Sequence, residues 1–393
     1  MKYDFDQMIN RENTACEKWD GLKDRFGVSE AIPMWVADMD FKSPPPVIEA
    51  LSQRVQHGIF GYTNRPDSYF EAIIDWGKRR HHWSIDKKWI AHSPGILPAL
   101  SSIINSFSQQ GDKVIIQTPV YHPFSQIIKS LGRESVSNPL KLENSRYMID
   151  IEDLKEKIDP TVKILVLCNP HNPVGRVWSE EELTMLGQIC IENNILVVSD
   201  EIHCDLVFRG NKHIPFASLS EEFANLTFTC IAASKTFNIA GLQTSSIIIP
   251  NQKLRDIFNK AINNQCIGSP NTFGMVAAES AYRYGEEWLE ELIDYLQGNL
   301  DFLICYFQKN IPQIKVIRPE STFLVWLDCR ELGLAKNELD ELMLSQAKVA
   351  MNEGYIFGVD GEGFMRMNIG CSRSLLEKCL RQIDGAVNFL CRA

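Results

Sequence analysis

The sequence predicts an α/β protein in which a mostly parallel β-sheet is covered by helices on both faces. Two observations support this fold class. The middle of the chain alternates short apolar runs, typical of buried strands, with segments whose apolar residues recur at helical spacing. Such alternation is typical of β-α-β units, which place helices on both sides of a parallel sheet. The 393 residues are also enough to bury a large core and to form more than one domain.

The predicted elements follow one another as expected for such units. An apolar helix begins after Gly95, and the motif SEEE at 179–182 is a capping box that starts a later helix. The middle of the chain is expected to hold a strand over 113–118, a helix over 124–130, a strand over 163–167, the helix after 179, a strand near 195, a strand over 227–233 and a strand over 245–249.

The last third of the chain has a different pattern. A long helix is predicted around 286–307, and after it the sequence predicts a strand over 322–327, a helix over 338–353 and a strand over 364–369. This order indicates a smaller α+β domain. We therefore expect residues 50–285 to form the large domain and residues 286–393 to form the small one.

Composition excludes several classes of protein. A net charge of −10 argues against a nucleic-acid-binding surface. The sequence has no apolar run of about 18 or more residues, as a membrane-spanning helix requires, and residues 1–6 lack the apolar core of a signal peptide. The eleven cysteines are scattered without a C-x-x-C pair, which predicts reduced thiols in the cytoplasm. No metal site is predicted.

Polar residues follow three of the predicted strands. Lys235, Asp200 and Asn172 each lie just beyond one of the apolar runs. In an open parallel sheet, ligands bind beyond the carboxyl ends of the strands. We therefore expect these three side chains to surround one ligand site.

These residue types fit a site for pyridoxal 5'-phosphate (PLP). A buried lysine has a lowered pKa, so the free amine of Lys235 can bond to the cofactor aldehyde and act as the catalytic base. Asp200 would keep the pyridine nitrogen protonated, and Asn172 would donate to the ring's phenolic oxygen. His203 lies on the same segment as Asp200. Taken singly, Asp200 and Asn172 also fit ordinary turn positions, and His203 fits a structural histidine.

The segment around Gly95 and Ile96 predicts a phosphate-binding helix start. Glycine is expected to turn the backbone there, and the free N–H groups at the start of the following apolar helix would bind an anion. An ordinary loop that enters a core helix is the alternative. Tyr121, after the strand over 113–118, is either a core aromatic or a ring that faces the ligand.

Together, these residues resemble the fold-type I PLP enzymes of the class I and II aminotransferase superfamily. The motifs NPHNPVG (169–175), SDEIH (199–203) and SKT (234–236) have the order and spacing of that family, and the resemblance spans nearly the whole chain. It implies a seven-stranded, mostly parallel sheet, a homodimer with shared active sites, and packing of residues 1–49 against the small domain. It also implies that Ser234 binds the phosphate and that Tyr121 stacks on the pyridine ring.

Within the superfamily, the chain is similar to the cystathionine β-lyase and cystalysin branch. The segment IPMWVADMDF (32–41) resembles the N-terminal signature of that branch. Tyr62 matches a tyrosine that, in the branch, reaches the cofactor phosphate of the neighbouring subunit. Gln243 stands where many aminotransferases carry a phosphate-binding arginine, and His203 stands where they carry tyrosine. From the residues alone, Trp35 fits core packing, and Tyr62 fits a surface turn.

Arg366 is the expected ligand of the substrate carboxylate. An arginine inside an apolar, strand-like run is costly to bury without a partner, which favours a binding role. Pairing with a buried acid is the alternative. Trp35 and Val36 are assigned to the same substrate site, and Tyr121 is a candidate for proton transfer near the β-carbon.

The resemblance implies a carbon–sulfur β-lyase that converts L-cystathionine, L-cysteine or S-substituted cysteines to pyruvate, ammonia and a thiol. Two alternatives stay open from the sequence. One is an aminotransferase on the same fold, and the other is a lyase-fold regulator that binds a partner protein. PLP is the expected cofactor.

Overall fold

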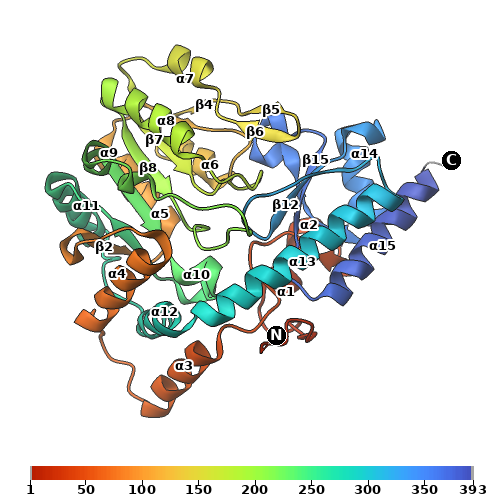
Figure 1. Ribbon diagram of the computed structural model, residues 1–393, viewed down its shortest axis with the longest axis horizontal. Coiled ribbons are helices and arrows are strands. Elements are labelled where there is room, and N and C mark those ends of the chain that lie inside the picture. The colour runs from red at the N-terminus through yellow and green to blue at the C-terminus, as the bar shows by residue number, and fades with distance from the viewer. Residues whose placement is uncertain (1, 391–393) are drawn as a thin grey trace.

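The structure, a computed structural model, describes residues 2–390 and contains one large sheet of seven strands (Figure 1). In spatial order these are β2 (Ile90–Ser93), β10 (Ser245–Ile248), β9 (Thr227–Ile231), β8 (Leu196–Asp200), β7 (Val162–Cys168), β3 (Lys113–Ile116) and β4 (Glu134–Ser137). Strand β10 is antiparallel to both of its neighbours, whereas the pairs from β9 to β4 are parallel. The predicted α/β class and sheet are confirmed.

Helices cover both faces of this sheet because its strands are apolar on both faces. In β7, Ile164 and Val166 join one core cluster, while Leu165 and Leu167 join another. Because alternate strand residues point to opposite faces, each cluster is one face of the sheet. Helices α5 (Ile96–Phe107), α6 (Pro123–Ser130) and α11 (Gln252–Asn264) pack on the first face, and α7 (Ile151–Lys157), α8 (Glu180–Glu192) and α9 (Glu221–Leu226) pack on the second. The predicted capping box of α8 is present.

A second, antiparallel sheet lies in the C-terminal part of the chain. Its strands are β11 (Lys315–Ile317), β12 (Leu324–Asp328), β15 (Phe364–Asn368) and β14 (Asn352–Glu353). The long helices α13 (Glu286–Asn310) and α15 (Arg373–Leu390) run beside each other next to this sheet (Figure 1), and all three contribute to one apolar cluster. The N-terminal segment joins this region because β1 (Ile32–Pro33) pairs in parallel with β13 (Val349–Ala350).

The remaining elements complete the fold. They are α1 (Glu17–Asp20), α2 (Leu22–Phe26), α3 (Pro45–His57), α4 (Asp67–His81), α10 (Ala233–Thr236), α12 (Thr272–Tyr284), α14 (Lys336–Glu341) and the hairpin of β5 (Lys141–Glu143) and β6 (Arg146–Met148). Within residues 2–390, no helix combines the length and the apolar character needed to cross a bilayer. The ten cysteines of this part are free thiols.

Two predicted elements differ from the structure. The helix expected over 338–353 ends early. Helix α14 is followed by a π-helical turn at Leu342–Gln346 and then by strands β13 and β14. The pairing of β13 with the distant β1 overrides the local helical pattern. The strand expected over 227–233 ends at Ile231, and the next residues form the short helix α10. The domain boundaries at 49 and 285 stay predictions.

The close packing of Gly175 against the loop before β12 can be tested by substitution. It has a φ of +73°, and an added Cβ would collide with Pro319 in the loop before β12. We expect Gly175→Ala to lower the free energy of unfolding by about 2 to 5 kcal/mol, from left-handed backbone strain and overpacking. Gly210→Ala is the matched control, because Gly210 also has a positive φ but open space around it. Equal losses in urea unfolding of the two variants would contradict the packing argument.

Candidate active site

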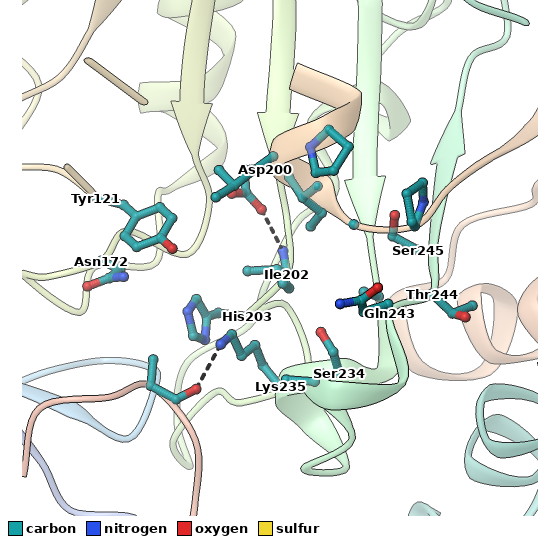
Figure 2. Close-up of a pocket in the computed structure, with 18 of the residues that line it drawn as sticks. Tyr121, Asn172, Asp200, Ile202, His203, Ser234, Lys235, Gln243, Thr244 and Ser245 are labelled. Atoms are coloured by element: carbon teal, nitrogen blue, oxygen red, sulfur yellow. Dashed lines mark hydrogen bonds between the residues drawn. The ribbon is translucent and has the colours of Figure 1, made fainter. Parts of the chain in front are cut away.

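The carboxyl ends of β7, β8 and β9 meet at one cavity of about 410 Å³ (Figure 2). Asp200 is the last residue of β8, Asn172 lies in the turn after β7, and Lys235 lies in α10 just after β9. The predicted residues that line the cavity are Gly95, Ile96, Tyr121, Asn172, Asp200, His203, Ser234 and Lys235. The structure therefore brings together the side chains that the sequence placed at separate strand ends.

Lys235 presents an amine whose proton is loosely held. Burial lowers the pKa of Lys235 to about 8, against the opposing effect of the nearby Asp38 and Asp200 carboxylates. Its Nζ donates to the main-chain oxygen of Ala37 at 2.8 Å. At pH 7 roughly a tenth of such an amine is uncharged, far more than for a solvated lysine, and the uncharged form is the nucleophile and base.

Asp200 is a buried carboxyl group that forms no ion pair within residues 2–390. It is 5% exposed, and the main-chain N–H of Ile202 donates to it at 3.2 Å. Burial raises the pKa of Asp200 to about 7. A ligand that carries a protonated ring nitrogen would restore the ionised carboxylate here. His203, which lines the same cavity, is held neutral because burial lowers its pKa to about 3, and its Nδ1 has no partner among the described residues.

The start of α5 and the residues opposite form a cradle for an anion. Gly95 precedes the helix without a side-chain cap, so the first N–H groups of α5 have no side-chain acceptor among the described residues, and Ile96 and Leu97 line the cavity. The φ of Gly95 is −173°, an extended conformation open to any residue, so the expectation that glycine turns the backbone here is wrong. Ser234, Gln243 and Thr244 lie close together near this cradle (Figure 2).

Asn172 is oriented by an arginine from the second sheet. Its Oδ1 accepts from Nη1 of Arg366 at 3.0 Å, which leaves the side-chain NH₂ as a donor. Figure 2 shows this nitrogen turned toward the cavity, on the same side as Tyr121. Burial raises the pKa of the Tyr121 hydroxyl, so that it stays protonated. Both residues can therefore donate hydrogen bonds into the cavity.

Arg366 has only neutral partners. It is 4% exposed and donates to Asn172, to the main-chain oxygen of Trp35 at 2.7 Å and to Oδ1 of Asn352 at 2.5 Å. Burial lowers its pKa to about 10, and its Nε has no acceptor within the described residues. Pairing with a buried acid, the alternative raised by the sequence, is not observed for residues 2–390. A buried cation without a counter-ion suits the binding of an anionic ligand.

Four predicted residues do not line the cavity. Arg366 borders it through its hydrogen bond to Asn172, and the other three lie elsewhere. The indole of Trp35 packs against Phe26 and donates to the main-chain oxygen of Lys18, away from the cavity. Val36 contributes its main-chain oxygen, which accepts from Asn368. Tyr62 is fully exposed in the loop between α3 and α4 and borders a separate hollow. Within one chain, Tyr62 does not line the cavity that contains Lys235.

Sequence reasoning missed Ala37, Thr244, Ser245 and Asn368. The first three line the cavity, and Asn368 supports the segment that contains Ala37. Thr244 immediately precedes the apolar strand β10, and Ser245 is its first residue. This position at the end of a strand could have identified both as candidate site residues. Ala37 has no chemical signature because only its main chain takes part.

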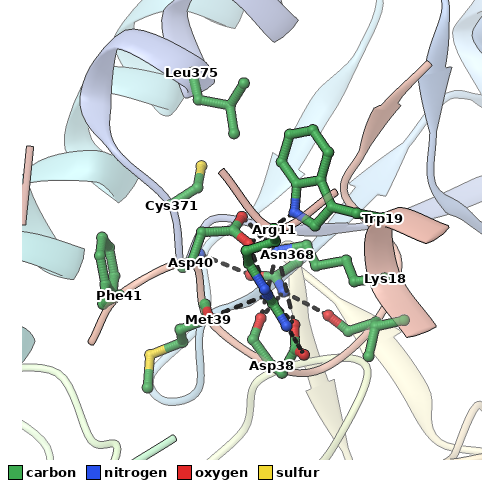
Figure 3. A network of polar contacts seen from close by, with 12 residues as sticks. Arg11, Lys18, Trp19, Asp38, Met39, Asp40, Phe41, Asn368, Cys371 and Leu375 are labelled. Carbon is green, nitrogen blue, oxygen red and sulfur yellow. Dashed lines mark hydrogen bonds and ion pairs between the residues drawn. The ribbon is translucent and has the colours of Figure 1, made fainter. Parts of the chain in front are cut away.

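A network of charges holds the segment that contains Ala37 (Figure 3). Lys18 is fully buried and pairs with Asp40 at 2.8 Å, and Arg11 bridges Asp38 and Asp40, each at 2.7 Å. The lysine and arginine hold the pKa of Asp40 below its usual range despite its burial. These contacts fix residues 38–40 beside the cavity wall.

The chain belongs to the aminotransferase class I and II family, whose model matches residues 30–383. It is 45% identical over 98% of its length to the whole of a cystathionine beta-lyase, PatB, from Bacillus subtilis. Its structure matches a PLP-bound putative aminotransferase from Clostridium difficile 630 with a TM-score of 0.97 and 45% identity, covering 98% of this chain and 100% of that one. It also matches cystalysin from Treponema denticola, which contains a PLP cofactor, with a TM-score of 0.96 and 38% identity, covering 99% and 100%.

Asp38 should set the proton affinity of Lys235. In cofactor-free protein, we expect acylation of Lys235, followed by peptide mass spectrometry, to rise as the pH passes about 8, because only the neutral amine reacts. The Asp38 carboxylate raises the pKa of Lys235, so Asp38→Asn should move this rise to lower pH. Asp24→Asn, at an exposed residue of α2, is the control and should leave the curve in place. An upward shift in Asp38→Asn would refute this assignment.

Proposed function

We propose that the chain is a PLP-dependent carbon–sulfur β-lyase that eliminates a thiol from L-cystathionine, L-cysteine or S-substituted cysteines and yields pyruvate and ammonia. The single observation that carries the proposal is the cavity where the Lys235 amine and the Asp200 carboxyl group meet at neighbouring strand ends. Full-length similarity to a cystathionine beta-lyase supports the choice of reaction. Bound PLP supplies an electron sink that acidifies the substrate α-proton.

The cavity residues fit this cofactor. The partly neutral Lys235 amine suits covalent attachment, and the buried Asp200 carboxyl group would hold the pyridine nitrogen. Asn172 has a free NH₂ for the phenolic oxygen. His203 and Tyr121 line the same cavity, where a neutral imidazole and an aromatic ring would flank the bound cofactor.

The phosphate end relies on main-chain donors. The N–H groups of Ile96 and Leu97, beyond Gly95, supply the helix start, and the Ser234 hydroxyl lies in the same cavity. Gln243 adds a neutral side chain where many family members carry a cation. A second subunit would bring Tyr62 to this phosphate.

Arg366 binds the substrate carboxylate through the donors that its neutral partners leave free, notably Nε. Trp35 and Val36 take part through their main chains, since the carbonyl of Trp35 orients the guanidinium. This arrangement holds the substrate α-carbon near Lys235, whose neutral amine takes the α-proton. Tyr121 lies where its hydroxyl can donate to a departing thiolate.

The chain acts as a homodimer with shared sites. The loop between α3 and α4 and the adjacent face of α3 expose large apolar side chains, which a partner subunit would cover: Ile48, Val55, Ile59, Phe60 and Tyr62. Because Tyr62 lies outside its own chain's cavity, it is available to a neighbouring one. The free thiols of the described residues fit a cytoplasmic location.

The first test is turnover of L-cystathionine without any keto acid. We expect the purified holoenzyme to release pyruvate, ammonia and free thiol in equal amounts, and Lys235→Ala to lose the absorbance of lysine-bound cofactor and about 1,000-fold or more of the rate. Turnover that requires an added keto acid would instead identify an aminotransferase. If Lys235→Ala kept its activity, Lys235 could not be the catalytic base.

The shared site predicts complementation between two inactive variants. Tyr62→Ala and Lys235→Ala each damage a different half of the site, so a mixed dimer contains one site with both residues intact. We expect verified subunit exchange to restore up to about a quarter of the wild-type rate, the statistical share of intact sites. As a control, Lys235→Ala mixed with Asp200→Ala should restore none, because both residues come from the same chain's cavity. No recovery in the first mixture would argue against a shared site.

A further inference from the structure

The hydrogen bond from Lys235 to Ala37 is the starting point (Figure 2). Within the described residues, the Nζ atom makes this one hydrogen bond, at 2.8 Å to the main-chain oxygen of Ala37. An amine that donates one N–H to a fixed acceptor loses its free rotation, so its lone pair points in a limited range of directions. The position of the Ala37 carbonyl therefore controls the direction in which Lys235 can accept a proton.

Asn368 holds the main chain on both sides of Ala37. Its Nδ2 donates to the oxygens of Val36 at 2.5 Å and of Asp38 at 2.6 Å, and its Oδ1 accepts from the N–H of Gly370 at 2.7 Å. The side chain is completely buried, at the end of β15. Because the carbonyls of both neighbours point at Asn368, the carbonyl between them is free to point at Lys235.

A second asparagine ties the same segment to the chain that carries the lysine. Asn238, three positions after Lys235, donates through Nδ2 to the oxygens of Met39 and Phe41, each at 2.8 Å. It also accepts from the N–H of Met39 at 3.0 Å. With the ion pairs in Figure 3, these contacts leave residues 36–41 little freedom to move relative to Lys235.

We propose that Asn368 is a positioning residue for proton transfer, acting through the Ala37 carbonyl on the Lys235 amine. The inference rests on the proposed function, in which the free amine of Lys235 takes the α-proton of the substrate. In the transfer, the Cα–H bond of the substrate breaks, a new N–H bond forms at Nζ, and the electron pair stays with the substrate. Both the amine and the ammonium can donate to Ala37, so the contact persists before and after the step.

The structure contains a matched control. Asn299 is also completely buried, and its Nδ2 also bridges two main-chain oxygens two residues apart, those of Ile369 at 3.1 Å and Cys371 at 2.9 Å. These carbonyls belong to the segment after β15 and do not contact Lys235. Asn299→Ala therefore removes the same kind of bridge but leaves both bonds from Asn368 to the carbonyls beside Ala37 in place, and it acts on that segment only through Gly370, which donates to Asn368 and accepts from Asp40.

The experiment measures exchange of the α-proton of L-alanine with D₂O by NMR, using PLP-loaded enzyme. Alanine has no leaving group, so this readout requires only proton transfer. We expect Asn368→Ala to slow the exchange roughly 10- to 100-fold, with the absorbance of lysine-bound cofactor retained. Asn299→Ala should lower the thermal midpoint by a similar amount but keep the exchange rate within about threefold of wild type. Equal slowing in both variants, or none in Asn368→Ala, would overturn the proposal.

A milder variant keeps the test decisive if Asn368→Ala fails to bind PLP. Asn368→Ser keeps one hydroxyl donor, which can reach one of the two carbonyls, and should slow exchange by an intermediate factor; a rate equal to wild type would contradict the positioning role. Release of pyruvate from L-cystathionine is measured on the same wild-type preparation. Its absence would overturn the lyase function, while the exchange rates would still decide the role of Asn368.

Discussion

The in-register parallel pairing of β7, β8 and β9 is the constraint on which the site depends. Cys168 pairs with Asp200, and Asp200 pairs with Cys230, so the three strands end at the same level. The chain then leaves each strand at one edge of the sheet, and the side chains just beyond must share one cavity. Any slip in this register would separate the Asp200 carboxyl group from Lys235, whatever their chemistry.

Burial then gives the cavity its electrostatic character. It raises the pKa of Asp200 to about 7 and lowers that of Lys235 to about 8, so the two values approach each other from opposite sides. A group in this state changes its protonation when a charged ligand arrives, which an ordinary solvated aspartate or lysine does not do at neutral pH. Arg366 complements them as a buried cation held by neutral oxygens.

The N-terminal segment forms part of the wall of the site, although it is distant in sequence from the other site residues. Its strand β1 pairs with β13, its buried Lys18 neutralises Asp40, and its Trp35 carbonyl orients Arg366. The same few residues therefore connect the second sheet, the buried guanidinium of Arg366 and the amine of Lys235. Most of these contacts use main-chain oxygens, so the function of the segment depends on its path more than on its side chains.

The sequence by itself determined the α/β class, five of the seven strands of the large sheet and the side chains that follow them, because apolar runs and strand-end chemistry are local properties; β2 and β4 were not predicted. Lys235, Asp200, Asn172 and the helix start after Gly95 could all be found in this way. Tertiary structure alone decided that residues 349–353 become strands, because the partner of β13 lies more than 300 residues away. It alone revealed Ala37 and Asn368 as well, since a hydrogen bond to a main-chain carbonyl depends on where the backbone passes and leaves no mark in the residue type.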